Sequence, residues 1–249
     1  MNRYFLEISY DGSAYHGWQV QKNAVSVQEK INDGLSKKLR EDIQCTGSGR
    51  TDTGVHALMQ VAHFDSTAVI KDPKTFLFQL NSMLPYDISA NQLFAVNTDA
   101  SARFDAISRS YIYRIHQSKN PFLQGRSYFF SRELDLEIMT KACDILLEWT
   151  DFEAFSKVHT DVKTFQCNIT AACWKHDNGT LVFSVTANRF LRGMVRTLVG
   201  TMLDLGENKI SLADFQAILE SRDRRRAGRS VPACGLYLSN IEFPETIKI

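Results

Sequence analysis

The order of strand and helix signals repeats in the two halves of the 249-residue chain, and this repetition limits the fold more than any other feature. Apolar alternation indicates strands, and apolar residues four positions apart indicate helices. Helix starts are marked by Ser26 followed by Glu29, and by Asp72-Pro73. The first half predicts strands at about 3–10, 43–47, 58–65 and 88–97, and helices at about 27–40 and 72–83. Their order is βαββαβ.

The second half shows the same order with one added helix. Asn178-Gly179 is a strong signal for a tight hairpin turn. Gly206 marks the end of one helix as a C-cap, and Ser211 with Asp214 marks the start of the next. The second half predicts strands at about 107–117, 164–176, 180–188 and 235–242, and helices at about 135–149, 190–205 and 211–222.

We therefore expect an α+β fold built from two ferredoxin-like (βαββαβ) subdomains. Their antiparallel sheets would adjoin and leave a central cleft. The N-terminal subdomain would span residues 1–106 and carry a catalytic loop, and the C-terminal subdomain would span residues 107–249 with the added helix. The alternative is one larger mixed sheet without duplication, because periodicity alone does not separate the two arrangements.

Composition narrows the class of protein. Hydrophobic residues make up 44% and charged residues 23% of the chain, which is typical of a globular protein. No stretch approaches the roughly 18–20 apolar residues of a membrane helix, and the first residues lack a secretory signal. The five cysteines are odd in number and form no C-x-x-C pair, so we expect a cytoplasmic protein without disulfides or structural zinc. His56 and His63 have no third metal ligand at a recognisable spacing.

The two halves differ at the connection between their middle strands. In the second half this connection is the tight Asn178-Gly179 turn, whereas in the first half it is a loop of about eleven residues with three glycines, 46–56. A hairpin does not need such a loop, and long ordered loops often bind ligands or carry chemistry. Arg50 and Asp52 are two residues apart and would point the same way in an extended chain. The alternative is a polar surface loop with a weak salt bridge.

Arginines gather at three further places. Arg109 and Tyr111 lie on a predicted strand that interleaves arginines with aromatics, a pattern suited to stacking on a base beside phosphates. The spacing of Arg189, Arg192 and Arg196 predicts one basic face at the start of the 190–205 helix, which an anionic partner would stabilise. The third group, a run typical of polyanion binding, contains Arg222, Arg224, Arg225, Arg226 and Arg229. The formal net charge is only +1, so any nucleic-acid surface must be local.

Several of these segments together resemble the TruA-type tRNA pseudouridine synthases, and the resemblance covers nearly the whole chain. The segments that carry it, in chain order, are Tyr10-Asp11-Gly12, 15–21, the Gly-Arg-Thr-Asp-Thr-Gly-Val-His sequence of 49–56, Arg103-Phe104, 108–113, 190–196 with 198–200, and 235–238. One departure is Thr53, where the family often has alanine.

The resemblance implies isomerisation of uridine to pseudouridine at positions 38, 39 and 40 of the tRNA anticodon stem-loop. It also implies a homodimer in which one tRNA contacts both subunits, and no cofactor. The reaction breaks the C1′–N1 bond, turns the base and forms a C1′–C5 bond. Nothing enters or leaves overall, so neither a redox group nor an energy source is required.

The resemblance also assigns roles to individual residues. Asp52 is the expected nucleophile, attacking either the base or the sugar of a flipped-out nucleotide, and Arg196 is expected to pair with it. Arg50 would hold the flipped nucleotide or help to evict the base, and Tyr111 would stack on or hydrogen-bond the base. Leu191 and Val195 would wall the pocket. The residues expected to bind tRNA phosphates are Arg109, Arg192, Arg224, Arg225, Arg226 and Arg229.

Two other function classes are compatible with parts of the sequence. A non-catalytic RNA-binding protein is one, because ferredoxin-like sheets often bind RNA. A small-molecule enzyme that uses the glycine-rich loop is the other, but it leaves the arginine clusters without a role.

Overall fold

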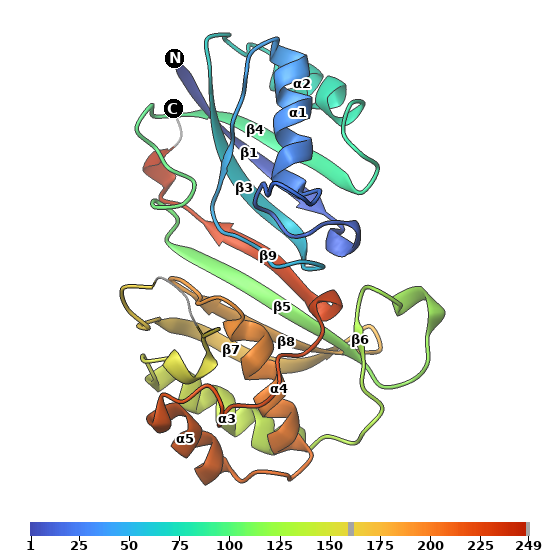
Figure 1. The fold of residues 1–249 in the computed structure, drawn as a ribbon, viewed down its shortest axis with the longest axis vertical. Helices are drawn as coiled ribbons and strands as arrows, with labels where there is room; N and C mark the ends of the chain where they lie inside the picture. Colours follow the sequence, from blue (N-terminus) through green and yellow to red (C-terminus); the bar gives the residue numbers. More distant parts are fainter. Residues whose placement is uncertain (159–161, 248–249) are drawn as a thin grey trace. The chain divides into compact units, whose positions relative to one another are not determined.

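The computed structural model describes residues 1–158 and 162–247 of the chain. It divides into two compact units, each described by itself below. Unit 1 contains Met1–Ile107 together with Tyr237–Ile249, and unit 2 contains Ser108–Leu236. The C-terminal segment therefore returns to the unit in which the chain began, as the colours from blue to red show in Figure 1.

Unit 1 is built on a sheet in the order β4-β1-β3-β9. The strands β1 (Asn2–Tyr10), β3 (His56–Ser66) and β4 (Ile88–Val96) pair antiparallel, with β1 in the centre. The short β2 (Thr46–Gly47) adds to β3 on the way into the glycine-rich loop. β9 (Leu236–Glu242) pairs with β3 in parallel at only two positions, His56 with Tyr237 and Ala57 with Leu238. The C-terminal strand thus meets β3 directly after that loop.

The helices of unit 1 begin where their local sequences predict. α1 (Val27–Leu39) starts at a complete capping box, because Ser26 accepts from the amide of Glu29 and the Glu29 carboxylate accepts from the amide of Ser26. α2 (Pro73–Asn81) starts at Asp72, with Pro73 in its first turn. The apolar residues of α1 at four-residue spacing, Val27, Ile31 and Leu35, are all fully buried. The expected amphipathic helix is confirmed.

Unit 2 carries its own sheet, in the order β5-β8-β7. β5 (Ser108–His116), β8 (Thr180–Ala187) and β7 (Ile169–Asp177) pair antiparallel. Asn178 (φ 47°) and Gly179 (φ 75°) join β7 to β8, so the predicted tight turn is confirmed. A further strand, β6 (Tyr128–Phe129), pairs with β5 in parallel and was not expected from the sequence.

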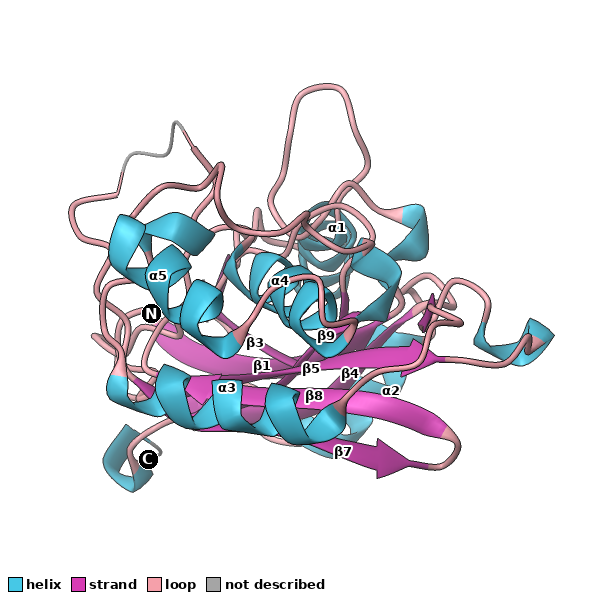
Figure 2. Ribbon diagram, turned by 90° about the horizontal axis from the view of Figure 1, so that it is seen from below, coloured by secondary structure: helices cyan, strands magenta, loops and turns pink. Residues whose placement is uncertain are grey.

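The unit also contains the helices α3 (Leu136–Glu148), α4 (Met194–Gly206) and α5 (Leu212–Ser221). α3 packs on β7, and α4 and α5 pack against α3. Figure 2 shows the helices beside the magenta strands. The capping box of Ser211 and Asp214 starts α5 as predicted. α4 is almost completely buried, because Leu198, Val199 and Met202 have no exposed surface. It is the central helix of unit 2 and carries Arg196.

The α+β class is confirmed, and two element boundaries need correction. The helix expected at about 190–205 begins only at Met194, because its N-cap, Gly193, has a left-handed backbone with φ 74°. Arg189 and Arg192 therefore precede the helix and share no helical face with Arg196. The strand expected from about 164 begins at Ile169, because Phe165 and Cys167 bond instead to Phe152 and Thr150.

Within residues 1–158 and 162–247, no helix combines the length and the apolar character needed to cross a bilayer.

Candidate functional site

The loop that carries Arg50 and Asp52 is held by hydrogen bonds to the segment after β1. The carbonyl of Thr51 accepts from the amide of Trp18 (3.2 Å), and the amide of Gly54 donates to the carbonyl of Tyr15 (3.3 Å). The hydroxyls of Tyr10 and Thr51 are hydrogen-bonded at 2.8 Å inside the unit. Asp52 is half-buried, and its carbonyl accepts from the amide of Val55 (3.1 Å). The loop is therefore fixed on both sides of Asp52.

Two glycines allow the chain segments to approach this closely. A Cβ atom on Gly12 would lie 2.0 Å from the carbonyl oxygen of Val55. A Cβ atom on Gly17, whose φ is +88°, would lie 2.4 Å from the carbonyl oxygen of Thr51. No side chain fits at either position. By contrast, a Cβ atom on Gly49 would have no neighbour within 4 Å.

A buried histidine supports the loop from its C-terminal end. His56 is 2% exposed, and its ring stacks on Tyr237 of β9 with 4.6 Å between the ring centroids. Its Nδ1 atom lies 3.1 Å from the amide nitrogen of Gly12 and 3.2 Å from Oδ1 of Asp11. His56 thus joins the loop, the segment after β1 and the C-terminal strand, a role that the sequence analysis missed.

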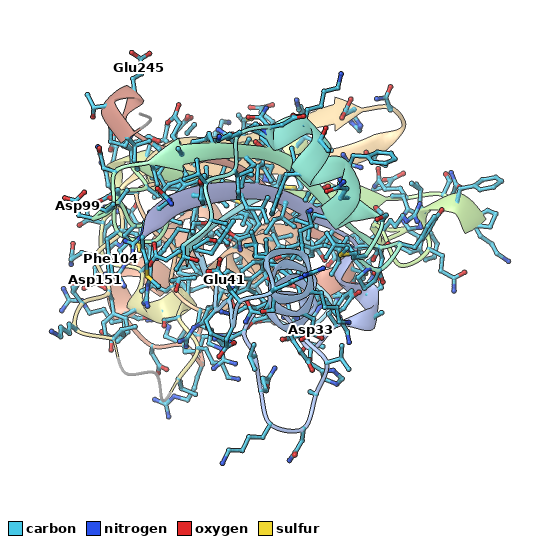
Figure 3. All side chains as sticks on the ribbon, turned by 90° about the horizontal axis from the view of Figure 1, so that it is seen from above. Asp33, Glu41, Asp99, Phe104, Asp151 and Glu245 are labelled. Carbon is cyan, nitrogen blue, oxygen red and sulfur yellow. The ribbon has the colours of Figure 1, made fainter. Side chains whose placement is uncertain are left out.

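Arg50 lies at the exposed side of the same loop. Its Nε donates to Oε1 of Gln19 (3.1 Å), and Nε2 of Gln19 donates in turn to Gln28 at the start of α1 (2.7 Å). Arg103 and Phe104, the other motif residues of unit 1, lie after β4; Phe104 is 80% exposed and is labelled in Figure 3. Unit 1 therefore presents a guanidinium and a carboxylate two residues apart on one ordered loop.

The candidate base-binding residues of unit 2 lie around the start of α4. Tyr111 of β5 is half-buried and meets Phe190 edge to face, with ring centroids 5.1 Å apart. Leu191 and Val195 flank Gly193 and are only 5% and 4% exposed. They contribute mainly to the core of unit 2, so any wall that they offer a base is small.

Arg196 is anchored to the segment that follows the arginine run. Its Nε donates to the carbonyl of Val231 (2.6 Å), and the amide of Val231 donates back to the carbonyl of Arg196 (3.2 Å). The hydroxyl of the next residue, Thr197, bonds that of Ser230 (2.9 Å). About one turn further along α4, Oγ1 of Thr201 accepts from the amide of Gly228 (2.9 Å). We call residues 228–231 the α4 strap.

The α4 strap needs a glycine on the helix beneath it. A Cβ atom on Gly200 would lie 1.8 Å from the carbonyl oxygen of Arg229. A Cβ atom on Gly228 would lie 2.9 Å from the backbone of Thr201. The position of the Arg196 guanidinium therefore depends on close backbone packing between α4 and the strap.

Four other arginines of unit 2 bond carboxylate, hydroxyl or backbone carbonyl oxygens. Arg225 forms an ion pair with Asp223 (2.7 Å), and its hydrogen bonds lower the pKa of that carboxyl to about 2. Arg229 donates to the hydroxyl of Tyr128 in β6 (2.7 Å). Arg224 donates to the carbonyl of Ala227, and Arg109 to that of Asn188. Arg192, Arg225, Arg226 and Arg229 are exposed.

The structure thus brings Arg50 and Asp52 together in unit 1, and Tyr111, Leu191, Val195 and Arg196 into one region of unit 2 around β5 and α4. Tyr128 and the α4 strap are additions that the sequence analysis missed. The glycines at 200 and 228 were the available signal for the strap. Among the described residues, no group of three or more His, Cys, Asp or Glu side chains is arranged to hold a metal ion.

Comparison with known proteins agrees with these motifs. A family model described as tRNA pseudouridine synthase matches residues 8–105 and 148–244. The tRNA pseudouridine synthase A of Bacteroides thetaiotaomicron is 47% identical to this chain, over 99% of the chain and 93% of the relative. The proteins of the same name from Porphyromonas gingivalis and Caldicellulosiruptor bescii are 45% and 37% identical. The alignment with the Porphyromonas gingivalis protein covers 99% of both chains. The alignment with the Caldicellulosiruptor bescii protein covers 98% of this chain and 100% of the relative.

Proposed function

The chain belongs to the tRNA pseudouridine synthase family, and from this premise we propose that it modifies uridines 38, 39 and 40 of the tRNA anticodon stem-loop with Asp52 as nucleophile. Membership makes the protein an isomerase that converts uridine to pseudouridine in tRNA. The observation that carries the rest of the proposal is the loop of residues 49–56, in which the family-like sequence around Asp52 is fixed by backbone hydrogen bonds on both sides.

The chemistry follows from what an ionised carboxylate can do on an extruded nucleotide. The target nucleotide leaves its stack, which costs a few kcal/mol. Asp52 attacks, and the C1′–N1 bond breaks. The base turns, the C1′–C5 bond forms, and the bond between Asp52 and the sugar or base breaks to free the carboxylate. The proton at C5 is lost while N1 gains one, so the product is an isomer of the substrate. A loop fixed by neighbouring backbone keeps the nucleophile in place without reorganisation during the reaction.

We propose that Arg196 is the ionic partner of Asp52. A guanidinium offers two parallel donors to a carboxylate and so fixes its orientation. The anchoring of Arg196 Nε on the carbonyl of Val231 supports this role, because it restricts the side chain to few conformations. Arg50 would hold the flipped nucleotide or evict the base, and Tyr111 would stack on the base, with Leu191 and Val195 beside it.

Exposed and half-buried arginines of unit 2 would bind tRNA phosphates. Each phosphate contact made by a basic side chain releases counterions, which makes affinity depend on salt. The residues to which we assign this role are Arg109, Arg192, Arg224, Arg225, Arg226 and Arg229. We also propose that the enzyme is a cytoplasmic homodimer in which one tRNA contacts both subunits, a proposal that rests on the family motifs and is tested by light scattering with and without tRNA.

The experiment that tests the proposal is tritium release from tRNA carrying C5-labelled uridine. The wild-type protein is expected to release tritium, and mapping of the product should place pseudouridine at positions 38–40. Asp52→Asn should bind tRNA with nearly unchanged affinity and release no tritium. Asp33→Asn, which alters an exposed carboxylate on α1, serves as the matched control and should behave as wild type. Undiminished release by Asp52→Asn would remove Asp52 from the mechanism.

A further inference from the structure

The connection between β5 and β6 is basic and aromatic. Residues 117–132 contain Lys119, Arg126 and Arg132 and no acidic residue. Phe122, at the tip, is 86% exposed, and Lys119 and Arg126 on either side of it are exposed as well. We call residues 117–127 the β5–β6 loop. Its composition differs from that of the whole chain, in which basic and acidic residues nearly balance, and it was not singled out by the family motifs.

The β5–β6 loop is ordered by its own hydrogen bonds. The side chain of Asn120 accepts from the amide of Phe122 (3.0 Å), and Pro121 fixes the backbone at the start of the short turn 121–123. The amide of Arg126 donates to the carbonyl of Leu123 (3.0 Å). At the base, Nε2 of Gln117 donates to the carbonyl of Arg132 (2.8 Å), beside the pairing of His116 with Phe129. The exposed ring is thus presented by a fixed turn.

The loop extends outward from the sheet of its own unit. Figure 1 shows it as the green segment beyond β6, and Figure 2 shows its helical turn beyond the ends of the strands. A large apolar side chain that an ordered turn holds in water lacks the favourable free energy that burial would provide. A partner that covers the ring would recover it.

Charge identifies the chemistry of that partner. A protein surface complementary to this loop would have to be acidic, whereas a nucleic acid offers phosphates for Lys119 and Arg126 and a flat base for Phe122 together. We propose that the β5–β6 loop is a second tRNA-binding element. The identity of the nucleic acid as tRNA rests on the proposed function. In it, Phe122 stacks on an unpaired base of the tRNA, and Lys119 contacts a neighbouring phosphate. The base that stacks is one other than the uridine that reacts at Asp52.

The test compares four variants by tRNA binding and by tritium release. Phe122→Ala is expected to raise the Kd for tRNA about tenfold, within the range measured for the loss of one base stack. Phe122→Trp should bind as wild type, because it keeps an aromatic face, whereas Phe122→Leu should weaken binding nearly as much as alanine. Lys119→Ala should reduce the slope of log Kd against log salt by about one. At saturating tRNA, all four variants should keep wild-type tritium release.

The matched control is Phe78→Ala, which removes a ring that is 78% exposed on α2 of unit 1 and should leave the Kd unchanged. An unchanged Kd for Phe122→Ala, or a Phe122→Leu variant that binds as wild type, would overturn the stacking proposal. A shift in oligomeric state with an unchanged Kd would assign the loop to a second copy of the chain instead. Either result would leave the proposed function intact, because that function is tested at Asp52.

Discussion

At the scale of single residues, the glycines that pack against the loop of residues 49–56 are the positions where the structure leaves least room for a side chain. Gly17 combines a positive φ with a carbonyl oxygen 2.4 Å from its missing Cβ. Gly17→Ala should therefore displace Thr51, and with it Asp52. We expect tritium release at saturating tRNA to fall at least tenfold while the Kd for tRNA changes little, measured on purified protein that is shown to be folded by circular dichroism.

Gly49→Ala is the control for this prediction, because it lies in the same loop and its Cβ atom would meet open space. Its activity should remain close to that of wild type. Equal losses in the two variants would indicate that the whole loop, rather than its support by residues 12–18, determines the rate.

A second residue-scale prediction concerns His63. Burial, and secondly the charge of Arg3, hold the pKa of His63 below its ordinary value, and its Nδ1 accepts from the amide of Ala102 (3.1 Å). Below about pH 6.5 the unfolded chain therefore binds a proton more readily than the folded chain does. The free energy of unfolding should fall as the pH decreases from about 6.5, until the folded form is protonated as well.

Urea denaturation between pH 7.5 and pH 5 measures this dependence. His63→Gln removes the titrating group and should flatten the curve relative to wild type, whereas the same change at the exposed His176 should not. A pH dependence that is the same in wild type and His63→Gln would assign the effect to other groups, among them His116, whose pKa is also lowered by burial.

At the scale of elements, α4 and the α4 strap act as one piece. Alanine in place of a helical glycine usually stabilises a helix by up to about 1 kcal/mol. Gly200→Ala should do the opposite, because its Cβ atom would lie 1.8 Å from the carbonyl oxygen of Arg229. We expect a lower melting temperature together with a loss of tritium release, since the strap carries the Val231 carbonyl that anchors Arg196. A more stable, fully active variant would contradict this packing.

The elements that the sequence predicted are those whose signals are local. Capping boxes, a proline in the first turn and an Asn-Gly turn each act within four residues, so α1, α2, α5 and the β7–β8 turn were predictable. β6 was missed because a strand of only two residues leaves no periodicity to detect. The start of α4 was misplaced because the apolar pattern extends to both sides of Gly193, whereas the left-handed backbone of Gly193 lets the helix begin only after it.

The residues of the candidate site also differ in whether a local sequence signal reveals them. Arg50 and Asp52 were candidates because an eleven-residue loop stands where a hairpin would suffice, and the resemblance to the family assigned their roles. The supports of the site were missed because they join residues far apart in the chain: His56 stacks on Tyr237, and Arg229 bonds Tyr128. Whether such residues meet depends on the register of β9 and β6, and no local pattern reveals it.

At the scale of the whole molecule, binding of a polyanion must come from a local surface, because the formal net charge is only +1. A variant with Arg224, Arg225, Arg226 and Arg229 all changed to alanine should lower the salt dependence of tRNA affinity by about three to four units of slope. Its melting temperature should change less than that of Gly200→Ala, because three of these side chains are exposed and only Arg224 is half-buried. Filter binding between 50 and 300 mM salt measures the slope, and an unchanged slope would exclude these arginines from the tRNA surface.

The return of β9 to unit 1 has a consequence for how the protein is made. During translation, residues 1–107 emerge from the ribosome long before Tyr237 and Leu238, which pair with the start of β3. Until then the ring of His56 has no Tyr237 to stack on, and the edge of β3 has no β9 to pair with. The nascent enzyme should therefore stay inactive until Tyr237 and Leu238 have emerged, so a ribosome stalled before residue 237 would hold a chain that cannot yet modify tRNA.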